Sequence, residues 1–102
     1  MIKHVVMWKL KPMPSEEKES TIQNMKAGLE GLAGKIEGLL DISAGGDFVR
    51  SEQSYDVALV STHASKEALL AYQDHPLHQE AANTLVKPFA LARAAVDFEC
   101  GE

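Results

Sequence analysis

The N-terminal stretch constrains the fold most, because its alternating residues are apolar on both sides. A strand over residues 2–10 would carry on one face Ile2, His4, Val6, Trp8 and Leu10. The other face would carry Val5 and Met7 between two lysines. An antiparallel strand with one wet face shows a cleaner alternation of apolar and polar residues. We therefore expect this strand to be covered on both sides.

The segment that follows predicts an amphipathic helix. Ser15 is a candidate N-cap, and two glutamates come next, where the helix dipole favours negative charge. Spacings of three and four place on one helical stripe Ile22, Met25, Leu29, Leu32 and Ile36. Gly34 is a reasonable C-terminal stop. Gly28 and Gly31 should cost the helix about 1 kcal/mol each relative to Ala, unless close packing needs the space.

Two further strands are predicted in the middle of the chain. The first covers residues 38–49, where Gly45-Gly46 suggests a bulge or a sharp bend. The second covers residues 55–63 and follows a polar connection. Ser65 then offers a cap for the next helix.

A proline should divide this next helical region. Proline breaks a helix interior but is favoured at a first helical position, so one helix should end near His75 and another begin near Pro76. Pro88 ends the second piece, and residues 89–99 predict the last strand.

The resulting order, β-α-β-β-α-β, is that of an α+β ferredoxin-like domain. It predicts one domain over residues 1–102, with a four-stranded antiparallel sheet and its helices on one face. The other face, with Val5 and Met7, would stay open in a monomer, and a large open apolar face is unusual. We therefore predict a homodimer through the sheet faces.

Composition narrows the partners and the compartment. The formal net charge is −5 and the basic residues are scattered, which argues against nucleic-acid binding. No apolar stretch approaches the roughly 20 residues of a transmembrane helix, so no membrane partner is expected. Cys100 is the only cysteine, and no signal peptide is visible. These features predict a cytoplasmic protein.

Three stretches together resemble the stress-responsive dimeric α/β-barrel family, the Dabb domain. They are the opening Ile2-Lys3-His4-Val5-Val6, the Tyr55-Asp56-Val57-Ala58-Leu59 strand and the Tyr72-x-x-His75-Pro76-x-His78 segment. The resemblance covers essentially the whole chain. It implies a dimeric α/β barrel, with a ligand cavity between the sheet and the helices of each protomer.

A plant branch of this family, the olivetolic acid cyclase-type polyketide cyclases, closes a linear polyketide without a cofactor. The resemblance to that branch implies functional roles for Tyr72, His78 and His4. That branch also carries a third-strand histidine, at the position that Val57 occupies here.

The residues themselves leave two roles open for each of these candidates. His4 shares a face with Trp8, so it should be buried and either tied to a neighbour or lining a cavity as a base. His78 lies near a helix start, where a cation is disfavoured, and is either a neutral base or a fold-stabilising histidine. Tyr72 either packs or donates a hydrogen bond to a carbonyl or enolate oxygen.

The remaining candidates concern ligand and metal binding. We expect Trp8, Leu59 and His75 to contact a ligand, although His75, directly before a proline, also suits a helix cap. His63, His75 and His78 offer a weaker metal hypothesis, but no cysteine helps and the proline makes ligand geometry unpredictable. We predict neither a metal nor a cofactor.

The predicted function is that of a dimeric stress-responsive protein that binds a small hydrophobic molecule in the cavity between sheet and helices. The alternative is a cofactor-independent cyclase or lyase that uses a histidine base and a tyrosine. A second alternative, from fold analogy alone, is a cofactor-free monooxygenase-like enzyme.

Overall fold

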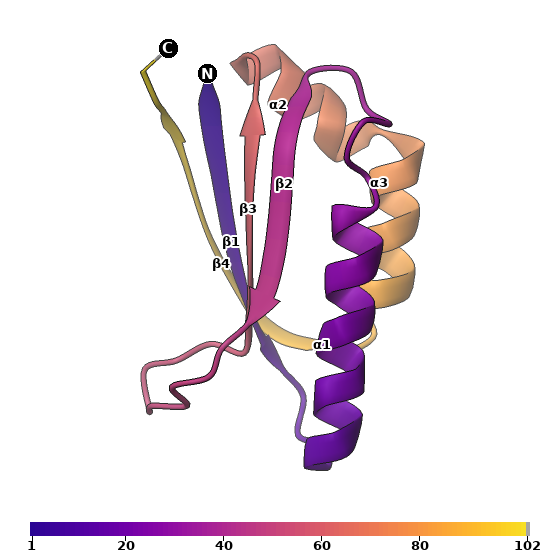
Figure 1. The fold of residues 1–102 in the computed structure, drawn as a ribbon, viewed down its shortest axis with the longest axis vertical. Helices are drawn as coiled ribbons and strands as arrows, with labels where there is room; N and C mark the ends of the chain where they lie inside the picture. Colours follow the sequence, from indigo (N-terminus) through magenta and orange to yellow (C-terminus); the bar gives the residue numbers. More distant parts are fainter. Residues whose placement is uncertain (102) are drawn as a thin grey trace.

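The computed structural model describes residues 1–101 and confirms the predicted element order. The elements are β1 (Ile2–Leu10), α1 (Ser15–Glu30), β2 (Leu39–Gly46), β3 (Val57–His63), α2 (Lys66–Asp74), α3 (Pro76–Ala81), the π-helical η1 (Ala82–Val86) and β4 (Ala90–Glu99). The strands form one antiparallel sheet in the order β2-β3-β1-β4. All the helices cover one face of that sheet, and the other face is open (Figure 1). The ferredoxin-like α+β fold is therefore confirmed.

β1 is one of the two inner strands of this sheet and shows the predicted two-residue period. Its helix-facing residues are buried, and Val6, Trp8 and Leu10 belong to the main core. The core residues that α1 contributes are Ile22, Met25 and Leu29. The apolar stripe of α1 thus packs on the helix-facing side of β1, as the periodicity predicted.

Both ends of α1 differ from the predicted ends. The helix begins at Ser15, so the N-cap position belongs to Pro14 and the Ser15 cap is wrong. It ends at Glu30 with Gly31 as C-cap, so the Gly34 stop is wrong as well. Low helix propensity at the glycines explains the early end. Leu32 is buried just beyond the helix, and its backbone N–H donates a hydrogen bond to the carbonyl oxygen of Leu29.

Gly28 is explained by close packing against the second helical layer. A Cβ atom at this position would lie 2.0 Å from Leu85 Cδ1 of η1. The small residue lets α1 and η1 approach each other, and this packing offsets the propensity cost of glycine.

The bulge predicted at Gly45-Gly46 is wrong. Both glycines pair regularly with β3, whereas the register shifts between Leu39 and Asp41. Gly46 instead leaves room for α1, since a Cβ atom there would lie 2.9 Å from Ile22 Cγ2.

The proline junction and its caps are as predicted. The Ser65 hydroxyl accepts a hydrogen bond from the Ala68 amide at 3.0 Å, which caps α2. α2 ends at Asp74, and Pro76 is the first residue of α3. His75 lies between them with φ −66° and ψ 136°, an extended conformation that the following proline favours.

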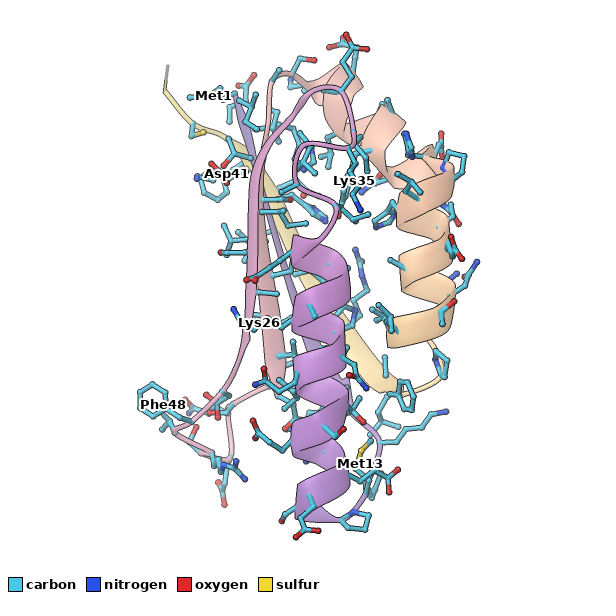
Figure 2. The ribbon with its side chains drawn as sticks, turned by 45° about the vertical axis from the view of Figure 1, so that its right-hand side comes forward. Met1, Met13, Lys26, Lys35, Asp41 and Phe48 are labelled. Carbon is cyan, nitrogen blue, oxygen red and sulfur yellow. The ribbon has the colours of Figure 1, made fainter. Side chains whose placement is uncertain are left out.

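The open face of the sheet is apolar along its middle. Strand register places Val96 of β4 beside Val5 and Val5 beside Val60, all on the side away from the helices. Val96 is 62% exposed and Met7 is 38% exposed. Figure 2 shows Phe48 at the outer end of the β2–β3 connection, away from the helices.

No helix within residues 1–101 is long and apolar enough to cross a lipid bilayer.

Candidate functional site

A cavity of about 320 Å³ lies between the helix-facing side of the sheet and the helical layer. Strands β1, β3 and β4 supply one wall, and helices α1, α2, α3 and η1 supply the other. Its lining residues are His4, Val6, Trp8, Leu29, Leu59, Tyr72, Gln73, His78, Gln79, Ala82, Val86, Lys87, Ala90 and Arg93. The size falls within the usual range for small-molecule sites, about 300–1,000 Å³.

Tyr72 reaches this cavity from the last turn of α2 and is 1% exposed. Burial raises the pKa of the Tyr72 hydroxyl to about 12, because the phenolate would lose its hydration. Burial is the one cause of this shift. The phenol therefore stays protonated at neutral pH and keeps a hydrogen bond to donate.

His78 faces Tyr72 across the proline junction, with ring centroids 4.4 Å apart. Its Nδ1 lies 3.2 Å from the carbonyl oxygen of Gln73. A carbonyl only accepts hydrogen bonds, so Nδ1 carries the proton and Nε2 is left with a free lone pair. Burial, more than any other cause, lowers the pKa of His78. The sequence predicted this direction from the helix start, whereas the main physical cause is desolvation.

His4 is buried as predicted and is held by a carboxylate. Its Nδ1 hydrogen-bonds Asp97 Oδ1 from the neighbouring strand, and the two residues lie directly opposite in the β1–β4 pairing. The bond fixes the orientation of the ring and places the proton on Nδ1. The His4 ring lies 6.2 Å from that of Tyr72, centroid to centroid.

His63 completes this aromatic cluster and is fully buried. Its ring centroid lies 4.7 Å from that of Tyr72, and its Nε2 lies 2.9 Å from Ser61 Oγ. Within residues 1–101 its Nδ1 has no hydrogen-bond partner. Burial lowers the pKa of His63 to about 4, and the nearby His4 adds to the shift. The sequence suggested only a metal-binding role for His63.

The structure brings most of the predicted site residues together. Trp8 and Leu59 line the same cavity as the three residues proposed for chemistry. His75 does not line it, because its Nδ1 accepts a hydrogen bond from the Leu77 amide at 3.1 Å and so caps α3. Capping, rather than ligand contact, is thus the role that the geometry gives to His75. Residues 1–101 contain no group of three or more potential metal ligands that includes His63, His75 and His78.

Sequence reasoning missed several polar residues around the cavity. Asp97 and Arg93 both lie on β4, opposite His4 and Trp8 respectively. The register of the edge strand β4 against β1 would have identified both residues. The sequence alone does not define that register, because the two strands lie far apart along the chain. Gln73 and Gln79 flank the proline junction, within the same segment that carries the predicted residues.

The arrangement suits proton transfer at a carbonyl compound. Tyr72 offers a protonated hydroxyl, and His78 offers a neutral imidazole with one accepting nitrogen. Tyr72 is buried and His78 is partly buried, and hydrogen bonds to a developing oxyanion are stronger in such surroundings than in bulk water.

The buried His63 predicts a loss of stability in acid. The ordinary histidine pKa is 6.5, and the folded protein holds the pKa of His63 at about 4. Between these values the unfolded chain binds a proton that the folded chain does not, so unfolding is favoured as the pH falls. We expect His63→Leu to show a shallower decrease in the free energy of unfolding from pH 6.5 to 4, measured by urea denaturation. An equal slope in the two proteins would contradict this assignment.

Comparisons with known proteins agree with this fold. A dimeric protein of unknown function with a ferredoxin-like fold from Bacteroides fragilis is 29% identical, with a TM-score of 0.87 over 97% of this chain and 95% of its own. A dimeric ferredoxin-like protein of unknown function from Jannaschia sp. CCS1 is 30% identical, with a TM-score of 0.76 over 97% of this chain and 98% of its own.

A more distant structure is the hydroxynitrile lyase from Passiflora edulis. It is 19% identical, with a TM-score of 0.75 over 99% of this chain and 94% of its own, and at this identity the likeness shows the fold alone. None of the curated proteins matches the sequence significantly. The family model of the stress responsive A/B barrel domain, Dabb, matches residues 2–100. The chain therefore belongs to the Dabb family, as its sequence motifs implied.

Proposed function

We propose that this protein binds a small, largely apolar organic molecule in the cavity between sheet and helices, without a cofactor. The observation that carries the proposal is the composition of the cavity wall. Apolar side chains from both layers surround the space, while Tyr72, His78 and His4 meet in it. An apolar pocket with a few convergent polar groups is the usual form of a small-molecule site.

A thermal-shift screen with a cavity-filling variant tests this proposal. Ala82 lines the cavity, so Ala82→Trp should fill part of it, whereas Ala71→Trp adds the same ring at an exposed position of α2. We expect members of a library of apolar carbonyl compounds to raise the melting temperature of the wild type and of Ala71→Trp by several degrees. Ala82→Trp should not respond. Equal responses in all three proteins would place binding outside this cavity.

The second candidate function is cofactor-independent proton abstraction, and the contact between Tyr72 and His78 favours it. In this reaction the free Nε2 of His78 takes a proton from the carbon next to a substrate carbonyl. The electron pair of the broken C–H bond forms a C=C bond, the π pair of the carbonyl moves onto its oxygen, and the Tyr72 hydroxyl donates a hydrogen bond to that oxygen. His4, fixed by Asp97, orients the substrate or the phenol. The resulting enolate would be the nucleophile in the ring closure of a cyclase. It would also be the nucleophile of a lyase that runs in its bond-forming direction. The monooxygenase alternative stays a prediction from the fold alone.

Exchange of substrate protons with solvent tests this chemistry directly. We expect the protein to accelerate deuterium uptake by 2,4-octanedione in D2O, followed by proton NMR. Loss of the base in His78→Gln should reduce the acceleration by about 100-fold or more. Tyr72→Phe should reduce it by about 10- to 100-fold, since one oxyanion donor is lost. Lys35→Gln, an exposed position outside the cavity lining, serves as the control. Exchange that persists in His78→Gln would eliminate His78 as the base.

We also propose that two copies of the chain associate through the open face of the sheet. Similar solved proteins are described as dimeric. The exposed Val96 and Met7, with Val5 between them, would be buried when a second sheet packs about 10 Å away. Burial of apolar surface stabilises such a contact by about 25 cal/mol per Å².

Opposite faces of β4 provide a matched test of this interface. Val96 lies on the open face, and its neighbour Ala95 lies exposed on the helix-facing side. We expect sedimentation velocity to show a dimer for the wild type and for Ala95→Glu, and a monomer for Val96→Glu. A monomeric wild type, or a dimeric Val96→Glu, would show that the interface lies elsewhere.

Two other properties remain predictions. They are the cytoplasmic location and the lack of nucleic-acid and membrane partners. The single domain over residues 1–102 also stays a prediction.

A further inference from the structure

The fully charged side chains that line the cavity are all cationic. Arg93 and Lys87 contribute to its wall, but no aspartate or glutamate does. This contrasts with the whole chain, which has 15 acidic and only 10 basic residues. Within residues 1–101 the ion pairs involve His4, Lys18, Lys26 and Lys66. Neither Arg93 nor Lys87 takes part in one. Two cations therefore face this space without a carboxylate from the described part of the chain.

These two cations come from different elements of the cavity wall. Lys87 directly follows η1, where the chain turns towards β4. Arg93 lies on β4 opposite Trp8 of β1, hence on the side of the sheet that faces the helices. The positive charges of both side chains contribute to the lowered pKa of His78, so both lie within electrostatic reach of that imidazole.

We propose that the ligand has an apolar body and one oxyanionic end, a carboxylate or a phosphate, which Arg93 and Lys87 bind. This inference rests on the proposed ligand-binding function of the same cavity. A guanidinium offers parallel N–H donors that match two oxygens of such a group, and an ammonium adds a point charge. The apolar wall that includes Leu59 and Val86 holds the apolar body.

The position of Arg93 sets the expected strength of the contact. Arg93 is exposed, so solvent and salt screen its charge. The preference for an anion should therefore be moderate, about tenfold in dissociation constant at low salt, and should shrink as salt is added.

Three probes with the same alkyl chain test the proposal by isothermal titration calorimetry on the full chain. They are octanoate, heptyl phosphate and the uncharged octanamide. We expect the wild type to bind one or both anions about tenfold more tightly than octanamide, and the stronger of the two identifies the oxyanion. Arg93→Gln should reduce the preference, because it should weaken the binding of the anions more than the binding of octanamide. Lys35→Gln removes the same charge away from the cavity lining and should keep the preference.

The outcomes separate this inference from the proposed function. If octanamide binds as tightly as both anions, and Ala82→Trp abolishes binding, the cavity binds ligands but the oxyanion inference is wrong. The same holds if Arg93→Gln weakens all three probes equally. If none of the probes binds the wild type up to its solubility limit, both proposals are contradicted. Circular dichroism of Arg93→Gln, an exposed position, confirms that the variant is folded.

Discussion

The pairing of β1 with β3 on one side and β4 on the other is the constraint on which the rest of the structure depends. Residues opposite each other in an antiparallel pair share a face of the sheet. The register thus places Ser61 and Asp97 beside His4, and Arg93 beside Trp8. A slip of β4 by one residue would turn both charged side chains towards the open face and leave the His4 ring without its carboxylate.

The helical layer depends on a second constraint, the break at Pro76. In an unbroken helix, residues six positions apart would point in directions about 120° apart. The extended conformation of His75 re-aims the chain, so that Tyr72 at the end of α2 and His78 in α3 face each other. The hydrogen bond that His78 Nδ1–H donates to the Gln73 carbonyl oxygen spans the junction and fixes the orientation of the imidazole.

Burial gives this site its electrostatic character. The loss of hydration lowers the pKa of His63 and His78 and raises that of Tyr72, so all three are neutral at neutral pH. Neutral side chains in an apolar wall favour the binding of uncharged parts of a ligand, and they favour proton transfer. Lys87 and Arg93, which line the same wall, add positive potential at the His78 end. The cavity therefore combines an apolar space, a neutral acid–base pair and a cationic region.

The sequence by itself determined the element order, the two apolar faces of β1 and the break at Pro76, because these depend on local periodicity and on backbone restrictions. It also singled out Tyr72, His78 and His4, through a short motif and a family resemblance. It misplaced the ends of α1 and the bulge of β2, since helix ends and register depend on packing that propensity does not contain. Only the tertiary structure decided that His63, Asp97 and Arg93 join the site, because partners so distant in sequence meet only when the strand register is set.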